Sequence, residues 1–218
     1  MRSDKEEVSS LMKQALDHFG TIDYLFNFAG ILRAGGLGGL QEKSLQEMLD
    51  INVLGTIYPI RAAVPFMQKQ GGGHITIISS LLGKYAFPGS SGYSASKFAL
   101  AGLSKALRQE LKYDNIGVTT VYPSYVGTAM LDAHLESVKS TAFYRQNSSY
   151  SPEDAVEAIL RAAAKNKREL IIPPAAALTV ILYNLMPRFS ETLIGRLSGG
   201  WPRYDEPDTC KEHPSSED

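Results

Sequence analysis

The sequence predicts an α/β domain in which helices alternate with the strands of a parallel sheet. Two observations indicate this fold class. Short apolar runs bounded by turn residues, such as 22–29 and 74–80, have the length and composition of buried strands. Between these runs, apolar residues recur at spacings of three and four, the pattern of a helix with one buried face. Because the two patterns alternate along the chain, we expect a parallel sheet covered by helices.

The first half of the chain contains two such helix–strand units. Apolar residues within 8–19 fall on one helical face, and Gly20 ends that helix. The run 22–29 is the expected strand, and a glycine-rich loop follows it. A second helix begins near Leu45 and continues, with a kink, through two internal prolines. A turn of three glycines then leads into the strand at 74–80.

The second half repeats the alternation. Its expected elements are a helix at 93–114, a strand at 118–122, a loop with short helical pieces at 128–150, a helix at 152–164, a strand at 170–172 and an apolar helix at 175–197. Pro152 suits the first turn of its helix, because proline lacks the amide that is unpaired there anyway. Pro187 should interrupt the last helix.

The composition allows one well-packed domain, which we expect at 1–198, followed by a disordered polar tail at 199–218. A net charge of −1 and an isoelectric point near 6.4 argue against nucleic acid or an anionic membrane as the main partner. One cysteine, Cys210, excludes a disulfide framework, and the four histidines are scattered without metal-ligand spacing. The first residues lack the apolar core of a signal peptide, so a cytoplasmic location is expected.

The most informative residues are a tyrosine and a lysine four positions apart, Tyr93 and Lys97. On a helix, this spacing places both side chains on one face. An ammonium about 4 Å from the phenol, in an effective dielectric of about 20, favours the phenolate by roughly 4 kcal/mol. This predicts a tyrosine pKa about three units below its usual value, suited to acid–base catalysis near neutral pH. Taken alone, the spacing also fits a half-buried core tyrosine and a solvated lysine.

Other polar segments surround this pair in a specific order. Upstream lie Asn27-Phe-Ala-Gly30, then Asn52 within a helix, then Ser80 at the end of an apolar run; Tyr122-Pro-Ser-Tyr-Val-Gly-Thr128 lies downstream. In order and spacing, these segments closely resemble the short-chain dehydrogenase/reductase family, from about residue 4 to 130 and more loosely to 174. The resemblance implies a Rossmann-like, doubly wound parallel sheet. It also implies NAD(P)-dependent hydride transfer between an alcohol and a ketone or aldehyde.

The resemblance gives the catalytic tetrad of the family a counterpart in Asn52, Ser80, Tyr93 and Lys97. Tyr93 would exchange a proton with the substrate oxygen, while Lys97 would lower its pKa and bind the nicotinamide ribose. Ser80 would hydrogen-bond the carbonyl oxygen, with the adjacent Ser79 as the competing candidate. Asn52 would hold a water beside the lysine or, alternatively, would be a structural amide bonded to a neighbouring strand.

The same resemblance implies which residues touch the cofactor, NAD or NADP. The implied contacts are Asn27, Ala29, Gly30, Tyr93, Lys97, Pro123 and Thr128. Two residues depart from the family pattern, because Phe28 stands in place of an asparagine and Ser124 in place of a glycine. Both departures weaken the predicted cofactor contacts without affecting the proton-transfer groups.

Family members begin with strands and a glycine-rich phosphate loop for which this chain shows no counterpart, so the resemblance implies an incomplete, N-terminally truncated fold. The glycines at 35–39 do not supply that loop, because a G-x-G-x-x-G pattern starting at Gly36 reaches Gln41. We therefore expect an exposed edge strand at 22–29 and weak cofactor binding by this chain alone.

Two functions remain open at this point: an oxidoreductase, or an inactive truncated member of the family that acts as an interaction or regulatory subunit. The expected substrate is a small apolar alcohol or carbonyl compound, selected by 128–150. The resemblance implies a homodimer or homotetramer formed through the helices at 44–70 and 93–114. The apolar helix at 175–197 would either cover the substrate pocket or make peripheral contact with a membrane.

Overall fold

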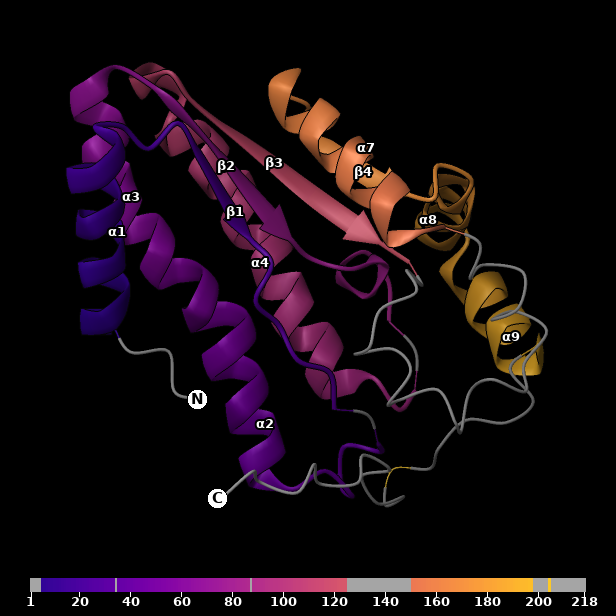
Figure 1. The fold of residues 1–218 in the computed structure, drawn as a ribbon. Coiled ribbons are helices and arrows are strands. Elements are labelled where there is room, and N and C mark those ends of the chain that lie inside the picture. Colours follow the sequence, from indigo (N-terminus) through magenta and orange to yellow (C-terminus); the bar gives the residue numbers. More distant parts are fainter. Residues whose placement is uncertain (1–4, 34, 87, 125–149, 198–203, 205–218) are drawn as a thin grey trace.

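Four parallel strands form one sheet, with helices on both of its faces (Figure 1). The computed structural model describes residues 5–33, 35–86, 88–124, 150–197 and 204. The strands lie in the order of the sequence: β1 (Tyr24–Asn27), β2 (Gly73–Ile78), β3 (Ile116–Pro123) and β4 (Glu169–Ile172). Each strand pairs in parallel with the next, as Leu25 with Ile75 and Val121 with Leu170. The predicted parallel α/β sheet is therefore confirmed.

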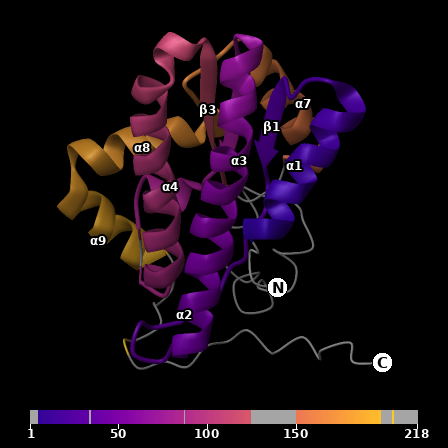
Figure 2. The same ribbon diagram turned by 90° about the vertical axis from the view of Figure 1, so that its left-hand side faces the viewer.

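Helices α1 (Lys5–Phe19), α3 (Gly55–Gln70) and α4 (Ser91–Glu110) cover one face of the sheet, and α7 (Pro152–Ala164) covers the other (Figures 1 and 2). The main core lies between the sheet and the first three helices, where Met67, Ile75 and Leu100 are completely buried. A second core joins α7 to β3 and β4. These two layers hold the carboxyl ends of the strands at fixed positions.

The expected kinked helix after residue 45 is made of three pieces. The α-helix α2 (Glu42–Met48) leads into a turn of π-helix, η1 (Leu49–Leu54), which continues as α3. Both prolines lie inside α3, so the irregularity precedes them instead of occurring at them. A π-helical turn inserts an extra residue and reorients the side chains that follow, and such turns are frequent at functional sites. Here the turn contains Asn52.

Strand β1 lies at the edge of the described sheet, as expected for 22–29. Tyr24, Phe26 and Phe28 stack along one of its faces, with ring centroids 6.0 and 6.2 Å apart. Tyr24 and Phe28 are about half exposed. The strand therefore presents aromatic surface on its exposed face.

Two short helices, α8 (Ala176–Leu185) and α9 (Pro187–Leu197), follow β4 and are separated at Pro187 as predicted. They lie beside the carboxyl ends of the strands in Figure 1. Among the described residues, no helix is both long and apolar enough to cross a bilayer. The predicted loop at 128–150, except for its last residue, lies outside the described part of the chain, as does the tail at 199–218 apart from Tyr204.

Candidate active site

The candidate site lies where β2 ends and α4 begins. Ser80 follows β2 by two residues and caps the short 3₁₀ helix η2 (Leu81–Gly83), accepting a hydrogen bond from the Leu82 amide at 3.2 Å. Tyr93 and Lys97 lie in the first two turns of α4. Ligands of parallel α/β sheets bind beyond the carboxyl ends of the strands, so these residues occupy the expected edge.

Burial raises the pKa of Tyr93 to about 12, while a hydrogen bond with the Ser80 side chain acts in the opposite direction. The expected lowering of this pKa by Lys97 is therefore wrong for the structure described. The reason is physical: removing a phenolate from water disfavours its charge, and here that effect outweighs any favourable contact. Tyr93 is consequently a protonated phenol at neutral pH and can donate its proton.

Lys97 is almost completely buried, with 4% of its surface exposed. Its Nζ donates a hydrogen bond to the carbonyl of Ile78 at 3.1 Å and lies 5.6 Å from the centroid of the Tyr93 ring. Burial lowers the pKa of Lys97 to about 8. The ammonium is thus close to the tyrosine but held by the strand, and its charge is only marginally favoured near neutral pH.

Asn52 is completely buried and all of its amide hydrogen bonds stay within the protein. Its Oδ1 accepts from the Ile31 amide at 2.7 Å, and its Nδ2 donates to the Ile31 carbonyl at 3.0 Å and to Ser96 Oγ at 2.9 Å. Ser96 in turn donates to the Tyr93 carbonyl at 2.7 Å. Of the two roles considered for Asn52, the contacts favour the structural amide, which joins the segment after β1 to the first turn of α4.

The two adjacent serines have different surroundings. Ser79 is buried, and its Oγ donates to the Lys97 carbonyl at 2.9 Å. Ser80 is half-buried and faces the phenol of Tyr93. The geometry therefore favours Ser80 over Ser79 as the group that meets a substrate. From the sequence, Ser79 is only a competing candidate for that position, because its spacing from α4 gives no signal of the contact with Lys97.

Only some of the residues predicted to contact the cofactor lie close together in the described structure. Asn27 is buried and its Nδ2 donates to the Thr76 carbonyl at 3.5 Å, which ties β1 to β2. A Cβ at Gly30 would lie 3.3 Å from Lys97 Nζ, so this glycine, which follows β1, lies directly beside the buried ammonium. Pro123 ends β3, Ala29 is exposed, and Thr128 lies outside the described residues. Lys97 therefore lies beside both Gly30 and the Tyr93 ring, so that an ammonium and a phenol, two groups that can hydrogen-bond a ribose hydroxyl, are close to a residue without a side chain.

The glycine-rich loop at 35–39 uses its amides internally. Gly35 donates to the Gly89 carbonyl, Gly38 to the Tyr204 carbonyl, and Gly39 to the Gly36 carbonyl. A Cβ at Gly38 would lie 2.4 Å from the Tyr204 ring, so the glycine is required for this contact. Amides that are already paired cannot cradle a phosphate. This supports the expectation that the loop does not replace a phosphate-binding loop.

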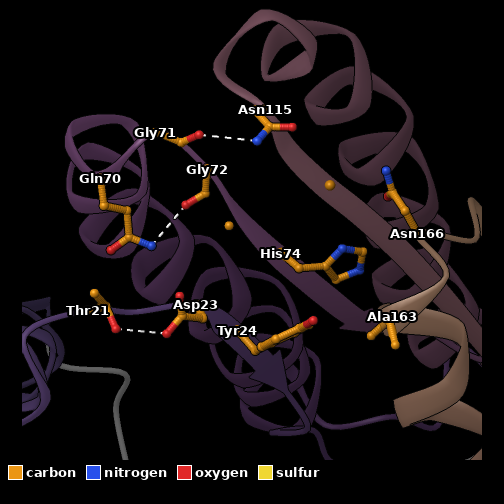
Figure 3. Close-up of a pocket in the computed structure, with 13 residues that line it drawn as sticks. Thr21, Asp23, Tyr24, Gln70, Gly71, Gly72, His74, Asn115, Ala163 and Asn166 are labelled. Carbon is orange, nitrogen blue, oxygen red and sulfur yellow. Dashed lines mark hydrogen bonds between the residues drawn. The ribbon is translucent and has the colours of Figure 1, made fainter.

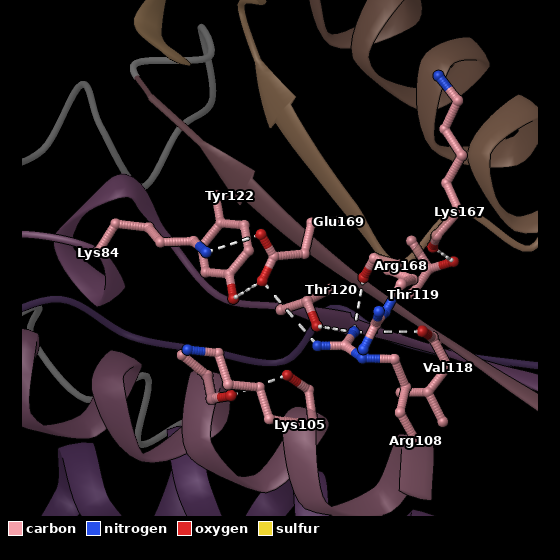
Figure 4. A network of polar contacts seen from close by, with 12 residues as sticks. Lys84, Lys105, Arg108, Val118, Thr119, Thr120, Tyr122, Lys167, Arg168 and Glu169 are labelled. Carbon is pink, nitrogen blue, oxygen red and sulfur yellow. Dashed lines mark hydrogen bonds and ion pairs between the residues drawn. The ribbon is translucent and has the colours of Figure 1, made fainter. Parts of the chain in front are cut away.

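A polar network fixes the outer side of the site (Figure 4). Glu169 on β4 accepts a hydrogen bond from Lys84 Nζ at 2.8 Å and one from the Tyr122 hydroxyl at 3.4 Å. Lys84 follows the η2 turn and lies over the Tyr122 ring, 4.2 Å from its centroid. Burial, followed by the charge of Glu169, raises the pKa of Tyr122. The network therefore anchors the turn that begins at Ser80 to β3 and β4.

A hollow of about 480 Å³ lies at the opposite edge of the sheet, at the amino ends of the strands (Figure 3). His74 lies in its wall. Its Nε2 is 2.9 Å from Thr119 Oγ1, which itself donates to the Lys167 carbonyl, so Thr119 must accept from Nε2–H. Burial lowers the pKa of His74, so its ring is neutral and structural. Across the described residues, no three His, Cys, Asp or Glu side chains could together hold a metal ion.

Known proteins resemble this chain in the segment that contains the site, at the end of β2 and the start of α4. A sequence profile described as short chain dehydrogenase matches residues 1–139. The chain belongs to the short-chain dehydrogenase family. Members of this family are oxidoreductases, and the match covers all four residues of the candidate tetrad. The predicted family and fold class are therefore confirmed.

Individual members of the short-chain dehydrogenase family show how far the similarity extends. The putative oxidoreductase SadH of Mycobacterium tuberculosis is 30% identical over 200 residues, which make up 88% of this chain and 72% of that protein. A 3alpha-hydroxysteroid dehydrogenase of Mediterraneibacter gnavus is 38% identical over 135 residues, 62% of this chain and 54% of that protein. The shorter match therefore has the higher identity.

Two solved structures of the family resemble the fold. A short-chain dehydrogenase/reductase of Burkholderia phymatum in complex with NAD aligns with a TM-score of 0.75 at 25% identity, covering 87% of this chain and 74% of that one. ElxO with NADP bound aligns with a TM-score of 0.71 at 28% identity, covering 78% and 73%. Both nicotinamide cofactors therefore occur among structures with this fold.

Proposed function

We propose that this short-chain dehydrogenase interconverts an apolar alcohol and a ketone or aldehyde, with a nicotinamide cofactor as the hydride carrier. One observation carries the proposal: a buried lysine and a protonated tyrosine lie on consecutive turns of α4, facing a serine hydroxyl at the end of β2. This arrangement suits proton transfer to an oxygen that becomes an alkoxide.

The residues of the chain divide the work during carbonyl reduction. Ser80 donates a hydrogen bond to the carbonyl oxygen and polarises it. Tyr93, which its raised pKa keeps protonated at neutral pH, then transfers its phenolic proton to the more basic alkoxide oxygen that forms. Lys97 stabilises the phenolate left behind, since an opposite charge within a few ångströms favours the ionised form. The cofactor, when bound, supplies the hydride.

The cofactor is NAD or NADP, and Gly30, Tyr93 and Lys97 would hold its nicotinamide ribose. The bound cofactors of the two neighbouring structures support this class without deciding between its members. Asn27, Ala29, Pro123 and Thr128 remain proposed contacts of the cofactor. Asn52 would contribute by holding the segment after β1 against α4.

An apolar substrate is supported by the name of one relative, a hydroxysteroid dehydrogenase, and by the apolar residues expected in the loop at 128–150. The proposal is tested by assaying the purified chain with steroid and long-chain ketones and with NADH or NADPH. Tyr93→Phe keeps the ring but removes the proton, so turnover should fall by about 10²–10⁴ while the fold stays intact. Retention of more than about a tenth of the activity would remove Tyr93 from the mechanism.

We also infer a homodimer or homotetramer formed through α3 and α4. On the outer surface of α4, Ala95, Ala99, Gly102 and Ala106 are all exposed, and nothing lies within 4 Å of a Cβ placed at Gly102. Small residues allow two helices to approach closely. Light scattering of the wild type and of Gly102→Lys tests this: the variant should be monomeric, and an unchanged assembly would exclude α4.

Peripheral contact with a membrane through 175–197 is a second proposal, and the side chains of α8 favour it. Leu178, Ile181, Leu182 and Leu185 form one helical stripe and are 45–74% exposed, while Ala176 and Val180 pack inward. An amphipathic helix with an exposed apolar face can lie in a bilayer interface. Cosedimentation with neutral lipid vesicles should be lost in Leu182→Glu, and no binding by the wild type would favour covering of the pocket instead.

An inactive interaction subunit is the alternative to an enzyme. The exposed aromatic face and the edge position of β1 favour it, because an unpaired edge strand is a template for pairing with another chain. Because weak cofactor binding by this chain alone is expected, the deciding result is the absence of any ketone reduction at saturating NADH and NADPH, in which case this alternative replaces the enzyme.

A further inference from the structure

Three consecutive residues at the end of β2 contact the Tyr–Lys segment of α4. The Ile78 carbonyl accepts the Lys97 ammonium at 3.1 Å, and Ser79 Oγ donates to the Lys97 carbonyl at 2.9 Å. Ser80 then faces the phenol of Tyr93. Lys97 is thus held at both of its ends, the main-chain carbonyl and the side-chain ammonium, by the last residue of β2 and the residue that follows it.

The Ser79 bond is placed where water cannot substitute for it. Ser79 is 2% exposed and Lys97 is 4% exposed. In a water-excluded environment a hydrogen bond is stronger, and its loss leaves a polar group without a replacement partner. The bond also comes from outside the helix, so it restrains the position of α4 relative to β2 and not the helix itself.

Gly83, in the η2 turn, packs against the hydrogen bond between Ser79 and the Lys97 carbonyl. A Cβ at this glycine would lie 2.4 Å from Ser79 Oγ and 2.7 Å from the Lys97 carbonyl oxygen, closer than real Cβ atoms approach. The η2 turn therefore passes directly over the hydrogen bond, and its own first residues follow Ser80. Strand, turn and helix meet at one point, one residue away from Ser80.

We propose that Ser79 is a positioning residue, which acts through Lys97 to keep Ser80 and Tyr93 aligned for proton transfer, and that Gly83 is required for its contact. This inference rests on the proposed oxidoreductase function. Ser79 itself does not touch the substrate. Its hydroxyl fixes how far α4 can slide along the end of β2, and a displacement of about 1 Å between reacting groups can cost roughly a hundredfold in rate.

The chain offers a matched control. Ser104 lies on the same helix, is completely buried, and donates to the Ala101 carbonyl at 3.0 Å. Its bond stays within α4 and cannot restrain the helix against the strand. Ser79→Ala and Ser104→Ala therefore remove the same kind of buried hydroxyl, and only the first removes a contact between elements.

The first readout is steady-state turnover. Ser79→Ala should lower kcat by about ten- to a hundredfold with little change in KM, whereas Ser104→Ala should keep the kcat of the wild type. Gly83→Ala should lower kcat independently, and its effect should shrink in the Ser79→Ala background, because removal of the hydroxyl makes room for the added methyl. The proposal would be overturned if the effects of Gly83→Ala and Ser79→Ala on kcat were strictly additive, or if Ser79→Ala and Ser104→Ala had the same kcat.

The second readout does not depend on turnover, so it separates this inference from the proposed function. The Lys97 side chain can be followed by NMR titration of ¹³Cε in lysine-labelled protein, with Lys97→Met identifying its signal. Ser79→Ala should shift this titration upward, because a loosened helix exposes the ammonium to water, and Ser104→Ala should leave it in place. If Ser79→Ala does not fold, the same titration is carried out on Ser79→Cys, whose side chain has a similar volume and a thiol that is only a weak hydrogen-bond donor. An unchanged Lys97 titration in the folded variant would refute the positioning role even in an inactive chain.

Discussion

Replacing Lys97 by methionine should stabilise the fold near neutral pH while it impairs the proposed reaction. Burial lowers the pKa of Lys97 from 10.5 to about 8. One pKa unit corresponds to about 1.4 kcal/mol, so the folded state disfavours the charged lysine by roughly 3 kcal/mol. Methionine fills a similar volume and carries no charge. It gives up the hydrogen bond to the Ile78 carbonyl, worth about 1 kcal/mol, which leaves a net gain of about 2 kcal/mol at pH 7.

The pH dependence of the free energy of unfolding separates the effect of Lys97 ionisation from the effect of side-chain packing. Between pH 8 and 10.5, the unfolded wild type binds a proton that the folded state has released, so wild-type stability rises with pH in this window. The methionine variant has no such titration. The stability advantage of the variant should therefore fall by about 3 kcal/mol from pH 7 to pH 10.5.

Urea unfolding followed by circular dichroism at a series of pH values measures both free energies. Lys105→Met, at an exposed position of the same helix, controls for the change in helix propensity. A difference between wild type and Lys97→Met that stays constant from pH 7 to 10.5 would refute the reasoning. It would mean that Lys97 is more hydrated than its burial indicates.

Two further substitutions test the contacts around the site. Asn52→Leu removes the amide that pairs both backbone groups of Ile31, so the free energy of unfolding should drop by about 2–3 kcal/mol; a loss below about 0.5 kcal/mol would contradict the structural role. Glu169→Gln should cost at most about 1 kcal/mol, since its pair with Lys84 is partly exposed. The same change should lower the pKa of Tyr122, because the carboxylate charge helps to raise it. Alkaline ultraviolet titration would show no change in tyrosine ionisation if the two groups do not interact.

The sequence alone was sufficient for those features that depend on local pattern. Alternating periods predicted the parallel sheet, and the positions of Gly20, Pro152 and Pro187 predicted where helices end or begin. The spacing of Tyr93 and Lys97 placed them on consecutive turns of one helix, and the order of polar segments around them indicated the family. These features are readable because periodicity, capping and turn chemistry act over a few residues.

Tertiary structure decided the electrostatics and the contacts between elements. The pKa of Tyr93 moves upward instead of downward, because burial depends on what the fold packs around the phenol and not on its helical neighbour. Asn52 bonds to Ile31 and Ser96, residues 21 and 44 positions away, and Ser79 reaches a carbonyl 18 positions away. Contacts of this kind follow from how the strand and helices meet. No local pattern records them, because desolvation and long-range hydrogen bonds are properties of the packed chain.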